Sequence, residues 1–220
     1  MSPRRTHRGG APPRVVRTLL GLGVVIVALA AVASPAAPPP LSADERRRLD
    51  GGEVVVRDSM PPGASASARG GTALAIVRAS PEQVWRVLID YPGHPRYYPR
   101  VVAAEVVQSD ERHAVVRYWV GIGPVSFSFH MDKFLDPQRR RIDWHLADGH
   151  GHGLFRENSG YWQVDEAERA SLVTYAIAVR TRLPSFLTGS AERESLVETM
   201  TSLRKLVEEG GAAAPAPAKP

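Results

Sequence analysis

Residues 72–88, TALAIVRASPEQVWRVL, join a β-strand directly to the start of a helix. In residues 72–78, small and large apolar side chains alternate with a period of two, which predicts a buried strand. Ser80, Pro81 and Gln83 have the spacing of a capping box with proline at the first helical position. Apolar residues then recur at helical spacing, so an amphipathic helix follows the strand at once.

The pattern of apolar residues changes after this helix. Asp90–Gly93 (DYPG) ends it, and residues 94–100, rich in Pro and Tyr, predict a short second helical turn. From Val101 onward the period is two, most clearly in residues 125–132, VSFSFHMD. Six consecutive strands with short connections predict an antiparallel sheet, apolar on one face and solvated on the other.

A last helix is predicted over about residues 190–209. Its apolar residues form one stripe at helical spacing: Leu196, Met200, Leu203 and Val207. A one-sided helix and a one-sided sheet each need an apolar partner, so we expect them to pack together. The element order is therefore strand, two short helices, six strands and a long helix, in an α+β fold.

The two ends of the chain differ in composition from this domain. Residues 1–33 have a basic start, an uncharged apolar run from Thr18 to Ala33 and an Ala-Val-Ala ending, which predict a secretory signal peptide. The alternative is an uncleaved signal anchor that keeps the domain near the membrane. Either way we expect an exported protein, periplasmic or secreted. Residues 34–70 predict a Pro/Gly-rich linker with a short helical turn, residues 71–209 the domain, and residues 210–220 a disordered Ala/Pro tail.

Charge and cysteine content exclude several classes of protein. The chain has a formal net charge of +5, but residues 1–33 alone contain five arginines and no acidic residue. The remainder therefore has a formal net charge of 0, and we expect no nucleic-acid partner. The chain has no cysteine, so disulfides, thiolate nucleophiles and Cys-ligated metals are excluded.

Several segments resemble the START-like helix-grip superfamily, also called SRPBCC, of the polyketide cyclase/dehydrase and coenzyme Q-binding type. They are residues 79–85 (ASPEQVW), 88–92 (LIDYP), 97–101 (YYPRV), 142–144 (IDW) and 159–162 (SGYW). The resemblance covers roughly residues 71–207. It implies a curved antiparallel sheet of about six to seven strands, wrapped on the long C-terminal helix, with two short helices after the first strand.

The resemblance also implies a cavity between the sheet and the C-terminal helix. The alternation then supplies candidate residues for binding an apolar ligand: Tyr118, Phe127, Phe129, Trp144, Trp162, Tyr175, Val179, Met200 and Leu203. The alternative is that these side chains fill a solid core, because apolar alternation marks a buried face whether or not it is hollow.

Polar residues give no clear catalytic or metal site. His145, His150 and His152 lie close together, but among glycines that favour an exposed loop over a metal centre. A second set lies on or beside the predicted inner strands, without the spacing of an acid–base pair: His130, Asp132, Glu157, Asn158, Arg180 and Arg182. Dinucleotide-binding, P-loop, nucleophile-elbow and HExxH motifs are absent, so we expect no cofactor and name no catalytic residue.

Three functions are compatible with this sequence. The first is an exported binding or carrier protein for an apolar small molecule, such as a lipid, a quinone or a polyketide-like compound. The second is a cyclase/dehydratase-like enzyme that uses the same cavity. The third is a protein–protein interaction module, which a collapsed cavity and an exposed apolar patch would favour.

Overall fold

A computed structural model describes residues 40–182 and 191–210. The chain divides into two units, Met1–Pro35 and Ala36–Pro220, and every described residue belongs to the second. The predicted signal peptide (residues 1–33), the start of the linker and nearly all of the predicted tail lie outside the described residues.

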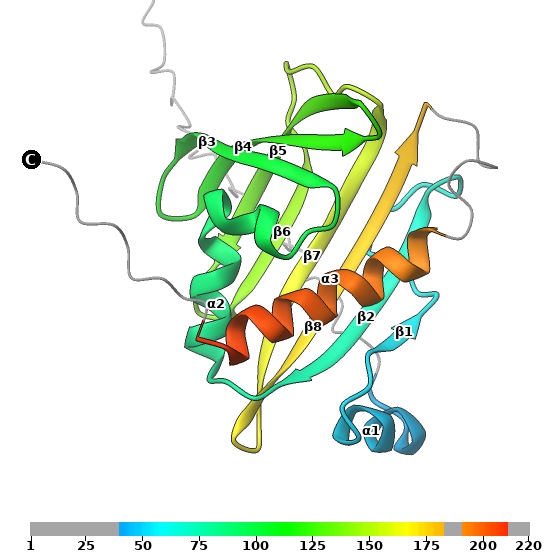
Figure 1. Ribbon diagram of the computed structural model, residues 1–220, viewed down its shortest axis with the longest axis vertical. Helices are drawn as coiled ribbons and strands as arrows, with labels where there is room; N and C mark the ends of the chain where they lie inside the picture. The colour runs from blue at the N-terminus through cyan, green and yellow to red at the C-terminus, as the bar shows by residue number, and fades with distance from the viewer. Residues whose placement is uncertain (1–39, 183–190, 211–220) are drawn as a thin grey trace, which may run out of the picture. The chain divides into compact units, whose positions relative to one another are not determined.

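The described residues form one antiparallel sheet of eight strands in the order β1-β2-β8-β7-β6-β5-β4-β3. The strands are β1 (Val55–Arg57), β2 (Arg69–Val77), β3 (Val101–Ser109), β4 (His113–Ile122), β5 (Val125–Asp136), β6 (Arg141–Leu146), β7 (Phe155–Ala167) and β8 (Ala170–Thr181). The six consecutive strands β3–β8 form the predicted meander, and β2 extends the sheet by pairing with β8. The sheet changes direction markedly between β8 and the β3–β5 end (Figure 1).

Three helical segments follow the predicted order. Helix α2 (Pro81–Ile89) begins with the expected capping box, in which the Ser80 side chain accepts from Gln83 N–H and the Gln83 side chain accepts from Ser80 N–H. The 3₁₀ helix η1 (Tyr91–Arg96) comes next, and α3 (Ala191–Glu208) is the long C-terminal helix. Over residues 40–182 and 191–210, no helix is both long enough and apolar enough to cross a membrane.

Helix α3 packs against one face of the sheet, over β8 and β2 in Figure 1. The predicted stripe faces the sheet, since all four of its side chains are at most 5% exposed: Leu196, Met200, Leu203 and Val207. They join a single core cluster with residues from α2, η1 and the inner face of the sheet. Burying a side chain of this kind stabilises the fold by about 1.5–3 kcal/mol, so the stripe fixes α3 on the sheet.

The ordered structure begins before residue 71, where the domain was expected to start. Helix α1 (Ala43–Asp50) is capped by Ser42, and β1 pairs with β2. Leu49 of α1 packs against Val55 and Leu74 on the sheet face opposite to α3, and Glu45 pairs with Arg57 at 2.7 Å. Strand β1 has only three residues, which are too few to show an alternating pattern. The sequence therefore predicted about six to seven strands, whereas the described residues form eight.

Candidate ligand-binding cavity

A cavity of about 610 Å³ lies between the inner face of the sheet and the N-terminal half of α3. Its wall includes Tyr98 to Val101 from the connection between η1 and β3 and the start of β3, side chains from β4 to β8, and Ser195, Leu196 and Thr199 from α3. The volume falls within the range of about 300–1,000 Å³ that is typical of small-molecule sites. The core is therefore hollow at this end of α3, rather than filled by side chains.

Five of the nine candidate cavity residues line this space: Tyr118, Phe129, Trp144, Tyr175 and Val179. The other four, Phe127, Trp162, Met200 and Leu203, do not. Met200 and Leu203 are at most 1% exposed and pack in the solid core beneath the C-terminal half of α3. Phe127 is half-buried near the start of β5. The sequence pattern identified the inner face correctly but did not show which part of it is hollow.

Stacked aromatic rings form one wall of the cavity. The Tyr175 ring stacks on Trp162 at 4.1 Å and on Trp144 at 5.8 Å between ring centroids. Trp162 Nε1 donates a hydrogen bond to the Tyr98 hydroxyl at 2.7 Å. Tyr98 and Tyr175 line the cavity, whereas Trp162 lies behind them in the core. Trp162 therefore supports the wall without reaching the space.

A glycine makes room for the Trp144 ring. A Cβ added at Gly160 would lie 2.6 Å from Cζ2 of Trp144, and closer still to the backbone oxygen of Ala176. Any side chain at position 160 would therefore displace the indole or the β7–β8 pairing. Asn158, two residues earlier on β7, holds the same indole through its Oδ1, which accepts from Trp144 Nε1 at 3.2 Å.

His94 holds the first short helices against the sheet. It is 1% exposed, with its Nε2 3.0 Å from the Leu88 carbonyl oxygen and its Nδ1 2.8 Å from the Tyr118 hydroxyl. A carbonyl only accepts, so Nε2 carries the proton and Nδ1 accepts from Tyr118. Burial, together with the positive charge of Lys133, lowers the pKa of His94 from 6.5 to about 3. A neutral imidazole thus fixes the orientation of a phenol in the cavity wall.

Lys133 is the one buried charged residue among the described cavity residues that the sequence analysis did not name. It lies on β5, is 3% exposed, and its Nζ lies 4.4 Å from the centre of the Trp144 ring and 5.4 Å from that of Tyr118. Its side chain lines the cavity and makes no hydrogen bond or ion pair with any described residue. Burial lowers the pKa of Lys133 from 10.5 to about 7.

The sequence contained a signal for this lysine. Phe129 and Met131 point inward, and the same alternation continues to position 133, while apolar Phe134 is 42% exposed on the other face. A lysine at an inward-facing position of an otherwise apolar strand is rare enough to mark a site.

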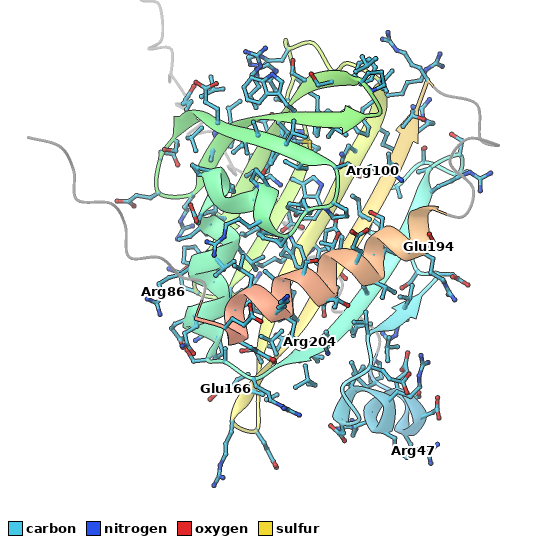
Figure 2. All side chains as sticks on the ribbon, in the orientation of Figure 1. Arg47, Arg86, Arg100, Glu166, Glu194 and Arg204 are labelled. Atoms are coloured by element: carbon cyan, nitrogen blue, oxygen red, sulfur yellow. The ribbon has the colours of Figure 1, made fainter. Side chains whose placement is uncertain are left out.

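Three arginines complete the polar part of the wall: Arg69, Arg100 and Arg180. Figure 2 shows Arg100 just before β3, far from Glu166 near the end of β7. Arg180 lies 3.6 Å from Glu157, which also accepts hydrogen bonds from the backbone and side chain of Ser65. Burial acts to raise the pKa of Glu157, but these hydrogen bonds and Arg180 together hold it below its ordinary value.

The other polar candidates lie away from the cavity. Asp132 faces the opposite side of β5 and pairs with His113 at 2.8 Å, while the rings of His130 and His150 stack at 4.3 Å. His145 is exposed and lies 3.9 Å from Asp132. Among the described residues, no three His, Asp or Glu side chains are placed to hold a metal ion.

Residues 77–204 match the family described as polyketide cyclase/dehydrase and lipid transport, which is more than half of the chain. The chain belongs to this family. The match runs from the end of β2 to the last turns of α3, so it spans most of the elements that form the cavity. No curated protein matches the chain.

Solved structures of the START type share the fold of this chain. The protein TTHA0849 from Thermus thermophilus is 20% identical with a TM-score of 0.54, and the match covers 65% of this chain and 98% of that one. A STAR-related lipid transfer protein from Xanthomonas axonopodis is 16% identical with a TM-score of 0.54, covering 70% and 92%. The di-domain aromatase/cyclase StfQ of the steffimycin pathway is 17% identical with a TM-score of 0.51, covering 64% and 45%. At these identities the similarity establishes the helix-grip fold alone.

Proposed function

We propose that this polyketide cyclase/dehydrase and lipid transport family member binds and carries an apolar small molecule in the cavity beneath α3. The observation that carries this proposal is an unfilled space of about 610 Å³ lined mainly by aromatic and aliphatic side chains. Apolar surface removed from water there stabilises a complex by about 25 cal/mol per Å², while a few polar groups orient the ligand.

The cavity also bears on the two alternatives. An interaction module was expected to have a collapsed cavity, and the open space argues against it. A cyclase or dehydratase needs a proton donor and acceptor within reach of its substrate. Among the described residues of the wall, the ionisable side chains are tyrosines, arginines and Lys133, and no carboxylate or histidine is present. The described wall therefore lacks the histidine and carboxylate groups that most often transfer protons, and its large apolar space supports the binding proposal.

We further propose that the domain acts outside the cytoplasm, either released from its leader or held near the membrane by it. The basis is the basic and apolar pattern of residues 1–33. Fractionation of cells that express the full chain, with N-terminal sequencing of the product, tests this proposal. A cytoplasmic product with an intact N-terminus would refute it.

Binding is tested by titrating the purified protein with N-phenyl-1-naphthylamine, a neutral dye that fluoresces in apolar surroundings. The proposal predicts saturable binding. Val179→Trp places an indole in the cavity and is expected to weaken dye binding about tenfold or more, because it removes volume from the site. Val107→Trp adds the same indole at a position of β3 that is 52% exposed, and should leave binding unchanged. Equal binding by both variants would place the dye elsewhere.

A further inference from the structure

Lys133 is buried without a partner of opposite charge. Lysine is almost never fully buried unless it is paired, because moving an ammonium out of water is costly. Its amine lies over the rings of Trp144 and Tyr118, and the Tyr118 hydroxyl in turn bonds the neutral His94. The two ring faces attract the ammonium but provide no hydrogen-bond acceptor. The amine therefore retains donors that only a molecule in the cavity is placed to meet.

The strand register shows that the side chain extends toward the cavity. Lys133 is paired with Ala114 on β4, but its Nζ lies near the ring of Tyr118, four residues farther along that strand. On the other side, Lys133 is paired with Trp144 of β6. Tyr118 and Trp144 both line the cavity, so the amine reaches its wall instead of ending in the solid core.

Asn158 presents a second donor beside the same indole. Its Oδ1 accepts from Trp144 Nε1, so its amide nitrogen is the atom left to donate. No described residue accepts a hydrogen bond from this nitrogen, and Asn158 lines the cavity at 8% exposure. Lys133 Nζ lies over the Trp144 ring, and Asn158 is bonded to the Nε1 of the same ring, so both residues offer N–H donors beside one indole. Two such donors suit the two oxygens of a carboxylate.

The charged side chains of the wall favour an anion with one negative charge over an anion with two. In the part of the chain that the structure describes, the wall contains cations and no carboxylate. Only Lys133 is buried deep in it, since Arg69 and Arg100 are exposed and Arg180 faces Glu157. A carboxylate carries one negative charge and forms a neutral pair with one ammonium. A phosphate monoester, with about two charges, would leave an uncompensated charge in an apolar space.

We propose that Lys133, with Asn158, binds the carboxylate of an amphiphilic acid whose hydrocarbon part fills the cavity. This inference rests on the proposed binding function and names the class of ligand: a fatty acid or another apolar monocarboxylate. The carboxylate supplies the partner that Lys133 lacks in the protein, and the aromatic wall binds the tail.

The test compares dodecanoic acid with dodecanol as competitors of N-phenyl-1-naphthylamine, using the full chain. The two competitors share a tail and differ in the head group. Wild-type protein should bind the acid about tenfold to a hundredfold more tightly, as expected for hydrogen bonds to a charged group. Lys133→Met should abolish this preference and retain binding of the alcohol, whereas Lys205→Met, at an exposed position of α3, should behave as wild type.

The outcomes separate the two proposals. Equal affinity for acid and alcohol in wild type, or an acid preference that survives Lys133→Met, would refute the role of Lys133 and leave the binding function intact. Absence of saturable dye binding would refute both. The wild-type comparison needs no variant, so equal affinities for acid and alcohol would refute the role of Lys133 even if Lys133→Met fails to fold.

Proton uptake gives an independent readout. At about pH 8 an amine with a pKa of about 7 is mostly neutral, and pairing with a carboxylate favours its protonated form. Calorimetry in buffers of different ionisation enthalpy should therefore show close to one proton taken up per dodecanoate bound, and none with dodecanol. No uptake with dodecanoate would contradict a bond to Lys133.

Discussion

Replacing Lys133 with methionine should stabilise the ligand-free protein, because it removes from the cavity wall a buried amine that pairs with no described residue. Lowering the pKa of a lysine from 10.5 to about 7 corresponds to about 5 kcal/mol of folding free energy at ~1.36 kcal/mol per pKa unit. Because the folded pKa lies below the unfolded one, the unfolded chain binds more protons between these values, and wild-type stability rises with pH across that range. The loss of folding free energy caused by burying Lys133 is therefore complete below about pH 7 and absent above about pH 10.5.

Urea unfolding of delipidated protein, followed by tryptophan fluorescence, measures this effect. Lys133→Met should be more stable than wild type by a few kcal/mol at about pH 6.5, and this advantage should shrink by about 3 kcal/mol at about pH 9.5. Lys205→Met serves as the control for removing a lysine from an exposed position. The reasoning fails if Lys133→Met is less stable than wild type at the lower pH, or if its advantage does not change with pH.

Three further perturbations test other parts of the structure. Leu203→Ala should destabilise the fold by about 2.7–5 kcal/mol in urea unfolding, whereas Val197→Ala, 37% exposed on the same helix, should change it by less than about 0.5 kcal/mol. Gly160→Val should abolish soluble expression or the near-ultraviolet circular dichroism of the native state, because no space exists between Trp144 and β8; a normal spectrum would show that the indole moves freely. The free energy of unfolding should fall as pH decreases from about 6.5 toward 3, because in this range the His94 side chain binds a proton in the unfolded chain but not in the folded one. His94→Leu should remove this contribution to the pH dependence, measured by urea unfolding at several pH values.

The fold was predictable because its signals are local and repeated. The capping box at Ser80, the long alternation after Val101 and the single stripe on α3 each specify one element, and a one-sided sheet needs a one-sided helix. Strand β1 was missed because three residues carry no period. Its pairing with β2 depends on contacts of Leu49 and Val55 with the outer face, which no local pattern contains.

The site was less predictable, because a hollow core and a solid core have the same alternation. The inner face was identified correctly, but the boundary of the cavity depends on how far η1 and α3 extend over the sheet. Met200 and Leu203 fall beneath the packed half of the helix, and Trp162 falls behind Tyr175. Lys133 was detectable from its position in the β5 alternation, but its lack of a partner is a property of three-dimensional packing.

Native mass spectrometry of the full chain, purified from the cells that express it, would test ligand binding most directly. The proposed function predicts a reproducible non-covalent adduct that is lost on denaturation and is reduced in Val179→Trp but not in Val107→Trp. The inference about Lys133 predicts in addition that the adduct is an apolar monocarboxylate. A clean apo mass that persists after incubation with a cell-lipid extract would contradict ligand binding in this cavity.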